Sequence, residues 1–115
     1  MNHRSDRVQS VIQEELGKIL QREVGIIDVL ITITAVEVDK KLETAKVKIG
    51  VIPQEKDEAV LRNLKNMQGK LQHLLNIKMN IKPMPRINLE IDRGAENAAR
   101  VEKLLIEEDL REPLQ

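Results

Sequence analysis

The chain has 115 residues, with 19 basic and 19 acidic side chains and no Cys, Phe, Tyr or Trp. This length predicts a single domain, residues 1–115, with an aliphatic core. The composition excludes disulfides, thiolate catalysis, cysteine-based zinc sites and the stacking of bases on aromatic side chains. Neither a membrane-spanning run nor a signal peptide is recognisable, so we expect a cytoplasmic protein without membrane contact.

The first expected element is an amphipathic helix at about residues 5–22. Ser5 can cap this helix, and Gly25 is a suitable stop signal. Between them, four apolar residues recur at the spacing of one helix face: Val8, Ile12, Leu16 and Ile19. This stripe predicts that the helix packs against a core.

A β-branched run at residues 29–38 predicts the first strand. Ile31 and Ile33 fall on one face of this strand, whereas Val36 and Val38 fall on the other. Two explanations stay open. Either both faces are partly covered, or a bulge near Ala35 switches the register.

A second strand is expected at residues 45–51, where apolar residues alternate with Lys46, Lys48 and Gly50. The alternation predicts a half-buried strand with a basic outer face. Only a short loop at residues 39–41 separates the two strands, which favours a hairpin.

Positive charge is concentrated in residues 59–89. This stretch contains no Asp or Glu and six basic residues: Arg62, Lys65, Lys70, Lys78, Lys82 and Arg86. Residues 1–58 carry a net charge of −2 and residues 90–115 a net charge of −4, so the neutral total hides a strong segregation. Such a local excess is typical of a polyanion-binding surface. The simpler interpretation is a solvated lysine face on an ordinary packing helix.

The same stretch predicts a long helix at about residues 56–77 that is interrupted near Gly69. Its apolar stripe consists of Val60, Leu64, Met67, Leu71 and Leu74. Gly69 has two explanations. It is tolerated within the helix at a cost of about 1 kcal/mol relative to Ala, or it marks a kink where the backbone comes close to another group.

Pro83 and Pro85 end this helical region, and alternating apolar residues predict a third strand at residues 87–91. A last helix is expected at residues 95–107, followed by an acidic and flexible tail at residues 107–115. The order of elements predicts one α+β domain with its core in residues 5–106. Its helices would cover one face of a three-stranded sheet.

Several segments resemble the ribosome-binding factor A family. They are residues 7–23, ITITAVEV (31–38), LETAKV (42–47), LKNMQG (64–69), residues 74–75, MPRI (84–87), residues 91–92, ARV (99–101) and residues 104–105. The resemblance implies a KH-type domain of α-β-β-α-α-β order. In the family, an Ala-x-Gly kink between two helices replaces the KH-type GxxG loop, and Met67, Gln68 and Gly69 occupy that motif here. The chain also has Gln72 and Leu89 where the family usually has an Arg and an aromatic residue.

The resemblance implies a non-catalytic, monomeric bacterial factor for ribosome biogenesis. It would bind the immature 30S subunit and its 16S rRNA and assist late maturation and rRNA processing. Phosphate contacts would come from Arg62, Lys65, Lys70, Lys78, Lys82 and Arg86. The exposed backbone at Gly69 would approach the sugar-phosphate chain closely. Lys46 and Lys48 would extend this surface if the outer face of the second strand is open.

The alternative hypothesis is a protein-interaction or self-associating module with a generic polyanion-binding patch. It rests on a potential edge strand and on the opposite charges of the central and C-terminal segments. An enzyme is not expected, because His3 lies near a terminus expected to be mobile, His73 has no Asp or Ser partner at motif spacing, and the glycines are isolated. We therefore expect no cofactor, metal or small-molecule substrate.

Overall fold

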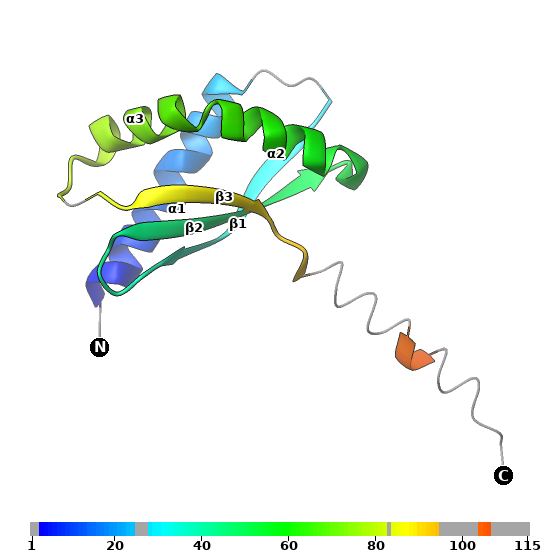
Figure 1. The fold of residues 1–115 in the computed structure, drawn as a ribbon, viewed down its shortest axis with the longest axis horizontal. Coiled ribbons are helices and arrows are strands. Elements are labelled where there is room, and N and C mark those ends of the chain that lie inside the picture. Colours follow the sequence, from blue (N-terminus) through cyan, green and yellow to red (C-terminus); the bar gives the residue numbers. More distant parts are fainter. Residues whose placement is uncertain (1–2, 25–27, 83, 95–103, 107–115) are drawn as a thin grey trace, which may run out of the picture.

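A computed structural model describes residues 3–24, 28–82, 84–94 and 104–106. Helix α1 (His3–Glu23) precedes strands β1 (Leu30–Val38) and β2 (Thr44–Ile52). A short 3-10 helix, η1 (Gln54–Lys56), leads into helices α2 (Asp57–Asn66) and α3 (Gln68–Met79), and strand β3 (Arg86–Ile91) follows. The expected α-β-β-α-α-β order is confirmed (Figure 1).

The three strands form one sheet in the order β1-β2-β3. Strands β1 and β2 are antiparallel, as the short loop between them predicted, whereas β2 and β3 are parallel. Buried side chains of all three strands lie on one face of the sheet. The helices cover this face (Figure 1). On the other face, Thr32, Glu37, Lys46 and Asn88 are exposed. The sheet therefore has one dry face and one wet face.

A β-bulge in β1 resolves the ambiguity in the first strand. The register shifts between Ile33, which pairs with Ile49, and Ala35, which pairs with Lys48. Val36 then pairs with the buried Val47. Because the extra residue reverses the alternation, the apolar residues on both sides of the bulge reach the same covered face.

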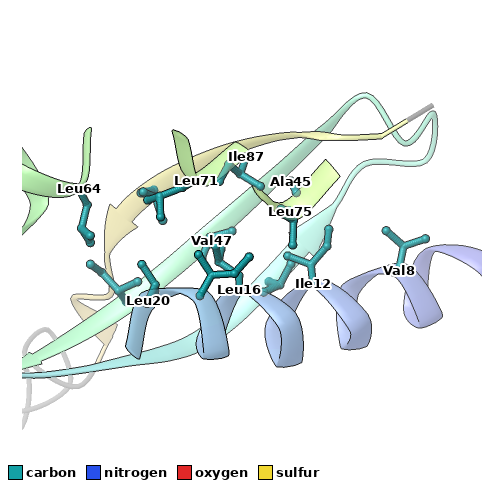
Figure 2. Close-up of a cluster of buried hydrophobic side chains, with 14 of the residues drawn as sticks. Val8, Ile12, Leu16, Leu20, Ala45, Val47, Leu64, Leu71, Leu75 and Ile87 are labelled. Carbon is teal, nitrogen blue, oxygen red and sulfur yellow. The ribbon is translucent and has the colours of Figure 1, made fainter. Parts of the chain in front are cut away.

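The core is built from aliphatic side chains of α1, α2, α3 and the sheet (Figure 2). Ile12 and Leu16 of α1 are completely buried, as are Leu71 and Leu75 of α3. Helix α1 begins at His3, so the predicted capping role of Ser5 is wrong, because Ser5 lies inside the helix. Of the predicted last helix, residues 104–106 are helical, and the rest of that prediction lies outside the described residues, as does the tail.

Candidate nucleic-acid interface

The predicted kink between the helices is present and lies at Met67. Met67 separates α2 from α3 with backbone angles of φ −96° and ψ 4°. Its N–H donates to the carbonyls of Asn63 at 3.2 Å and Leu64 at 3.1 Å, and its own carbonyl accepts a hydrogen bond from the Leu71 N–H at 2.9 Å. The series of backbone hydrogen bonds thus continues through the break, which needs no unusual backbone conformation.

Gly69 is exposed on the first turn of α3. A Cβ atom built at this position meets nothing within 4 Å. Its φ is negative, so the conformation does not require glycine. Within the described chain, no group makes the close backbone approach that was predicted at Gly69, and the open space there faces outward.

The six basic residues of the central stretch are all exposed, but they form two groups. Arg62, Lys65 and Lys70 lie close to the kink, on α2 and the start of α3. The others lie at the far end of α3 and beyond it: Lys78, Lys82 and Arg86. From Gly69 to Lys78 the helix rises about 14 Å. The sequence alone suggested one continuous patch, whereas the structure gives a kink group and a distal group.

Ion pairs neutralise part of the predicted surface. The Lys70 ammonium lies 3.1 Å from the Glu23 carboxylate on α1. The hydrogen bond and charge of Lys70 hold the pKa of Glu23 below its ordinary value. Among the residues that the structure describes, no ion pair forms at Arg62, Lys65 or the three residues of the distal group. Within the described part of the chain, these five side chains carry uncompensated positive charge.

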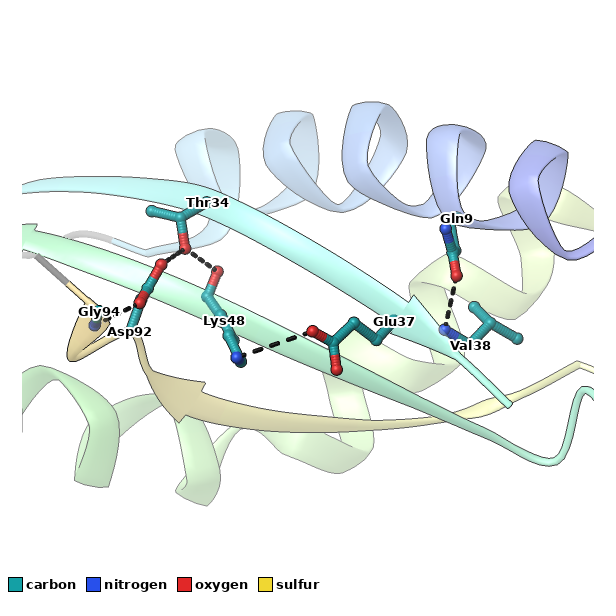
Figure 3. A network of polar contacts seen from close by, with 7 residues as sticks. All are labelled: Gln9, Thr34, Glu37, Val38, Lys48, Asp92 and Gly94. Atoms are coloured by element: carbon teal, nitrogen blue, oxygen red, sulfur yellow. Dashed lines mark hydrogen bonds and ion pairs between the residues drawn. The ribbon is translucent and has the colours of Figure 1, made fainter. Parts of the chain in front are cut away.

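Lys46 and Lys48 lie on the wet face of the sheet, on the opposite side from α2 and α3. This face is open at Lys46, which is exposed and forms no ion pair with a described residue. Lys48 is half-buried, and its ammonium lies 3.7 Å from the Glu37 carboxylate (Figure 3). Of these two, Lys46 is the better placed to contact a polyanion.

A second polar cluster joins the strands on the wet face (Figure 3). The Thr34 hydroxyl donates to the Asp92 carboxylate at 2.6 Å, and the Gly94 N–H donates to the same carboxylate at 2.8 Å. These two hydrogen bonds, with the nearby charge of Lys48, outweigh desolvation and hold the pKa of Asp92 below its ordinary value. The Asp92 carboxylate at this end of the wet face is therefore already engaged by other groups of the chain.

The hairpin turn adds two lysines that sequence reasoning did not single out. Lys40 and Lys41 are exposed at its tip. The turn is held by the Asp39 carboxylate, which accepts hydrogen bonds from the Glu43 N–H at 2.7 Å and the Thr44 N–H at 3.3 Å. The Arg86 N–H donates to the Glu43 carbonyl at 2.9 Å, so this turn lies beside the distal group. The adjacent lysines are visible in the sequence, but their proximity to Arg86 follows from the parallel pairing of β3.

Both edge strands of the sheet are partly covered by glutamines. On β1, the Val38 N–H donates to the Gln9 side chain at 3.0 Å (Figure 3). On β3, the Ile87 N–H donates to the Gln72 side chain at 2.8 Å. An uncovered edge is what another strand would pair with. This arrangement weakens the basis of the alternative hypothesis, which relied on a free edge strand.

The model of the ribosome-binding factor A family matches residues 4–105. The chain belongs to the ribosome-binding factor A family. A ribosome-binding factor A of Pseudomonas paraeruginosa is 34% identical, over 91% of this chain and 88% of the relative. A second, of Akkermansia muciniphila, is 26% identical, over 98% of this chain and 90% of the relative.

Solved structures of ribosome-binding factor A share the fold. The crystal structure of the Thermus thermophilus protein matches with a TM-score of 0.68 and 21% identity, covering 78% of this chain and 97% of that one. The solution structure of a Thermotoga maritima protein, described as a putative ribosome-binding factor A, matches with a TM-score of 0.66 and 24% identity, covering 82% of this chain and 92% of that one. A homology model of the Thermus thermophilus factor, fitted into a cryo-EM map of its complex with the 30S subunit, has a TM-score of 0.64 and 21% identity, covering 73% and 90%. The KH-like fold predicted by the resemblance is confirmed.

Proposed function

We propose that this chain is a non-catalytic assembly factor that binds the immature 30S subunit through the phosphate backbone of 16S rRNA. Membership of the ribosome-binding factor A family supports this proposal, as does the Thermus thermophilus relative that was fitted into a 30S complex. The observation that carries it is the set of exposed basic side chains on α2, α3 and β3 without acidic partners among the described residues. The factor acts as a monomeric domain in the cytoplasm, where it assists late maturation and rRNA processing.

Recognition in this proposal depends on shape and charge. Because the chain has no Phe, Tyr or Trp, it lacks the large aromatic side chains on which unpaired bases commonly stack. Its basic side chains position the factor on phosphates, and such contacts carry no sequence information of their own. The factor holds one rRNA conformation and leaves when maturation favours another, since release requires a difference in affinity between the two states.

Membrane association is not part of this proposal, and no described helix is long and apolar enough to cross a bilayer. Within the described residues, no three acidic or histidine side chains gather as metal ligands would. The proposed mechanism uses only the side chains and backbone amides of this chain.

The salt dependence of 30S binding tests the proposal. The double variant Arg62→Gln/Lys65→Gln removes two exposed charges of the kink group. If both contact phosphates, the slope of log affinity against log salt flattens by about 1.8, which is 0.9 for each contact on duplex nucleic acid. Affinity is measured by co-sedimentation with separated 30S and 50S subunits at several salt concentrations.

The matched control is Arg7→Gln/Lys56→Gln, which removes two exposed charges from α1 and η1, outside both basic groups and without ion pairs among the described residues. The control should keep the wild-type slope. Equal flattening in both double variants would mean that binding reflects total charge rather than this surface. Equal binding of the wild-type protein to 30S and 50S subunits would contradict the proposed target.

A further inference from the structure

Two glutamines of α3 occupy the free edge of β3. The Arg86 N–H points toward β2 and donates to the Glu43 carbonyl, so the backbone groups of the next residue, Ile87, face away from the sheet. The Ile87 N–H donates to the Gln72 side-chain oxygen at 2.8 Å. The Ile87 carbonyl accepts a hydrogen bond from the Gln68 side chain at 2.7 Å.

Gln72 uses both ends of its amide. While its oxygen accepts from Ile87, its nitrogen lies 3.1 Å from the Pro85 carbonyl and 2.9 Å from the Asn76 side-chain oxygen. A primary amide that accepts from one residue and donates to the residue two positions earlier reproduces the pattern of a neighbouring strand. Gln68 and Gln72 are one helical turn apart and half-buried, so α3 substitutes for a fourth strand over this short segment.

The opposite edge of the sheet has a looser version of this arrangement. On α1, Gln9 accepts from the Val38 N–H at 3.0 Å, and the Gln13 side chain donates to the Ile33 carbonyl at 3.4 Å. Both pairs have the same spacing on their helices. They differ in place, because Gln68 immediately follows the break at Met67, whereas the α1 pair lies in an uninterrupted helix.

Helix α3 is thereby held on several sides. Leu71 and Leu75 are buried in the core, and Lys70 pairs with Glu23 of α1. The glutamine pair adds the contact to β3. Because Gln68 is the first residue of α3, its hydrogen bond acts on the turn that contains Gly69.

We propose that Gln68 and Gln72 are positioning residues that lock the start of α3 to the edge of β3 and so fix the kink for contact with rRNA. This inference rests on the proposed function. It assigns Gln72 to holding α3 against β3 from within the fold.

The test compares two double variants that each remove one glutamine pair. Gln68→Ala/Gln72→Ala opens the β3 edge, and Gln9→Ala/Gln13→Ala, the matched control, opens the β1 edge. In the first variant we expect faster hydrogen exchange at the Ile87 amide and a changed orientation of α2 relative to α3 in residual dipolar couplings. We also expect 30S affinity to fall by about tenfold, equivalent to about 1.4 kcal/mol. In the control, helix orientation should be unchanged and affinity should fall by less than about twofold.

Thermal stability is measured for both double variants, so that a general loss of folding is recognised. If Gln68→Ala/Gln72→Ala does not fold, the single variant Gln68→Ala, which removes one hydrogen bond, takes its place with the same expected directions. An unchanged α2–α3 orientation, or a fall in 30S affinity equal to that of the control, would overturn the positioning role. If the wild-type protein does not bind 30S subunits, the proposed function fails, while the dipolar couplings still decide whether the glutamines position the kink.

Discussion

The substitution Gly69→Ala tests separately whether glycine is required at this position for folding and for 30S binding. Gly69 lies in α3 with a negative φ, and an added Cβ meets nothing within 4 Å. Ala is a better helix former than Gly and restricts the unfolded chain, so Gly69→Ala should stabilise the free protein by about 0.5 to 1 kcal/mol. For a domain of this size, this gain raises the melting temperature by roughly 2–8 °C.

The same substitution should weaken 30S binding if an rRNA backbone approaches Gly69. Gly17 in α1 provides a matched control, because a Cβ there also meets nothing within 4 Å. Gly17→Ala should stabilise the protein to a similar degree and leave 30S affinity unchanged. Differential scanning calorimetry measures the stability, and co-sedimentation with 30S subunits measures the affinity.

The two measurements refute different steps of the reasoning. If Gly69→Ala destabilises the free protein, the first turn of α3 does not have the open, helical geometry described above. If Gly69→Ala stabilises the protein and binds 30S subunits as well as Gly17→Ala does, the open space at Gly69 is not a contact with rRNA. Stabilisation together with weaker binding is the expected combination.

Three further predictions concern the core, an ion pair and the hairpin turn. Leu75→Ala removes a completely buried side chain and should lower the free energy of unfolding, measured in urea, by about 2–5 kcal/mol, with loss of the folded state as the extreme outcome. A cost below about 1 kcal/mol would contradict the packing of α3 on α1. Glu23→Gln releases Lys70 and should steepen the salt slope of 30S binding by up to about 0.9, and an unchanged slope would mean that Lys70 does not contact phosphate. Desolvation opposes ionisation of Asp39, but hydrogen bonds from Glu43 and Thr44 outweigh it and hold the pKa of Asp39 below its ordinary value. The ionised Asp39 therefore stabilises the fold above the unfolded pKa of about 3.9, and this stabilisation is lost as pH falls through the folded pKa. Acid titrations followed by circular dichroism should therefore show a smaller loss of stability below about pH 4 in Asp39→Asn than in the wild-type protein.

The sequence predicted the elements well because each has a strong local pattern. The stripe from Val8 to Ile19 and the alternation in β2 fix type and approximate bounds without tertiary information. The bulge in β1 was one of two explanations, since the faces of Ile33 and Val36 depend on which β2 residues they pair with. The parallel pairing of β3 follows from the path of the whole chain, which local periodicity does not encode.

The sequence predicted which residues make up the candidate site, but not how they are arranged on the surface. Counting charges identified the basic residues of α2, α3 and β3, but the neutralising partner of Lys70 lies in α1, far away in the sequence. The glutamine contacts were missed for the same reason. Gln68 and Gln72 look like ordinary polar helix residues until the fold brings Ile87 beside them.

In the proposed function, the spacing of the two basic groups is what distinguishes one rRNA conformation from another. The chain lacks Phe, Tyr and Trp for base stacking, and the β3 edge at Ile87 is engaged by its own glutamines. What remains is the kink group and the distal group, whose members on α3, Lys70 and Lys78, lie about 12 Å apart along the helix. Because this helix is anchored in the core through Leu71 and Leu75, the separation is fixed by the fold. If both groups contact phosphates as proposed, they favour the rRNA conformation that matches their spacing, and a rearrangement that changes the spacing lowers affinity without any change in sequence or salt.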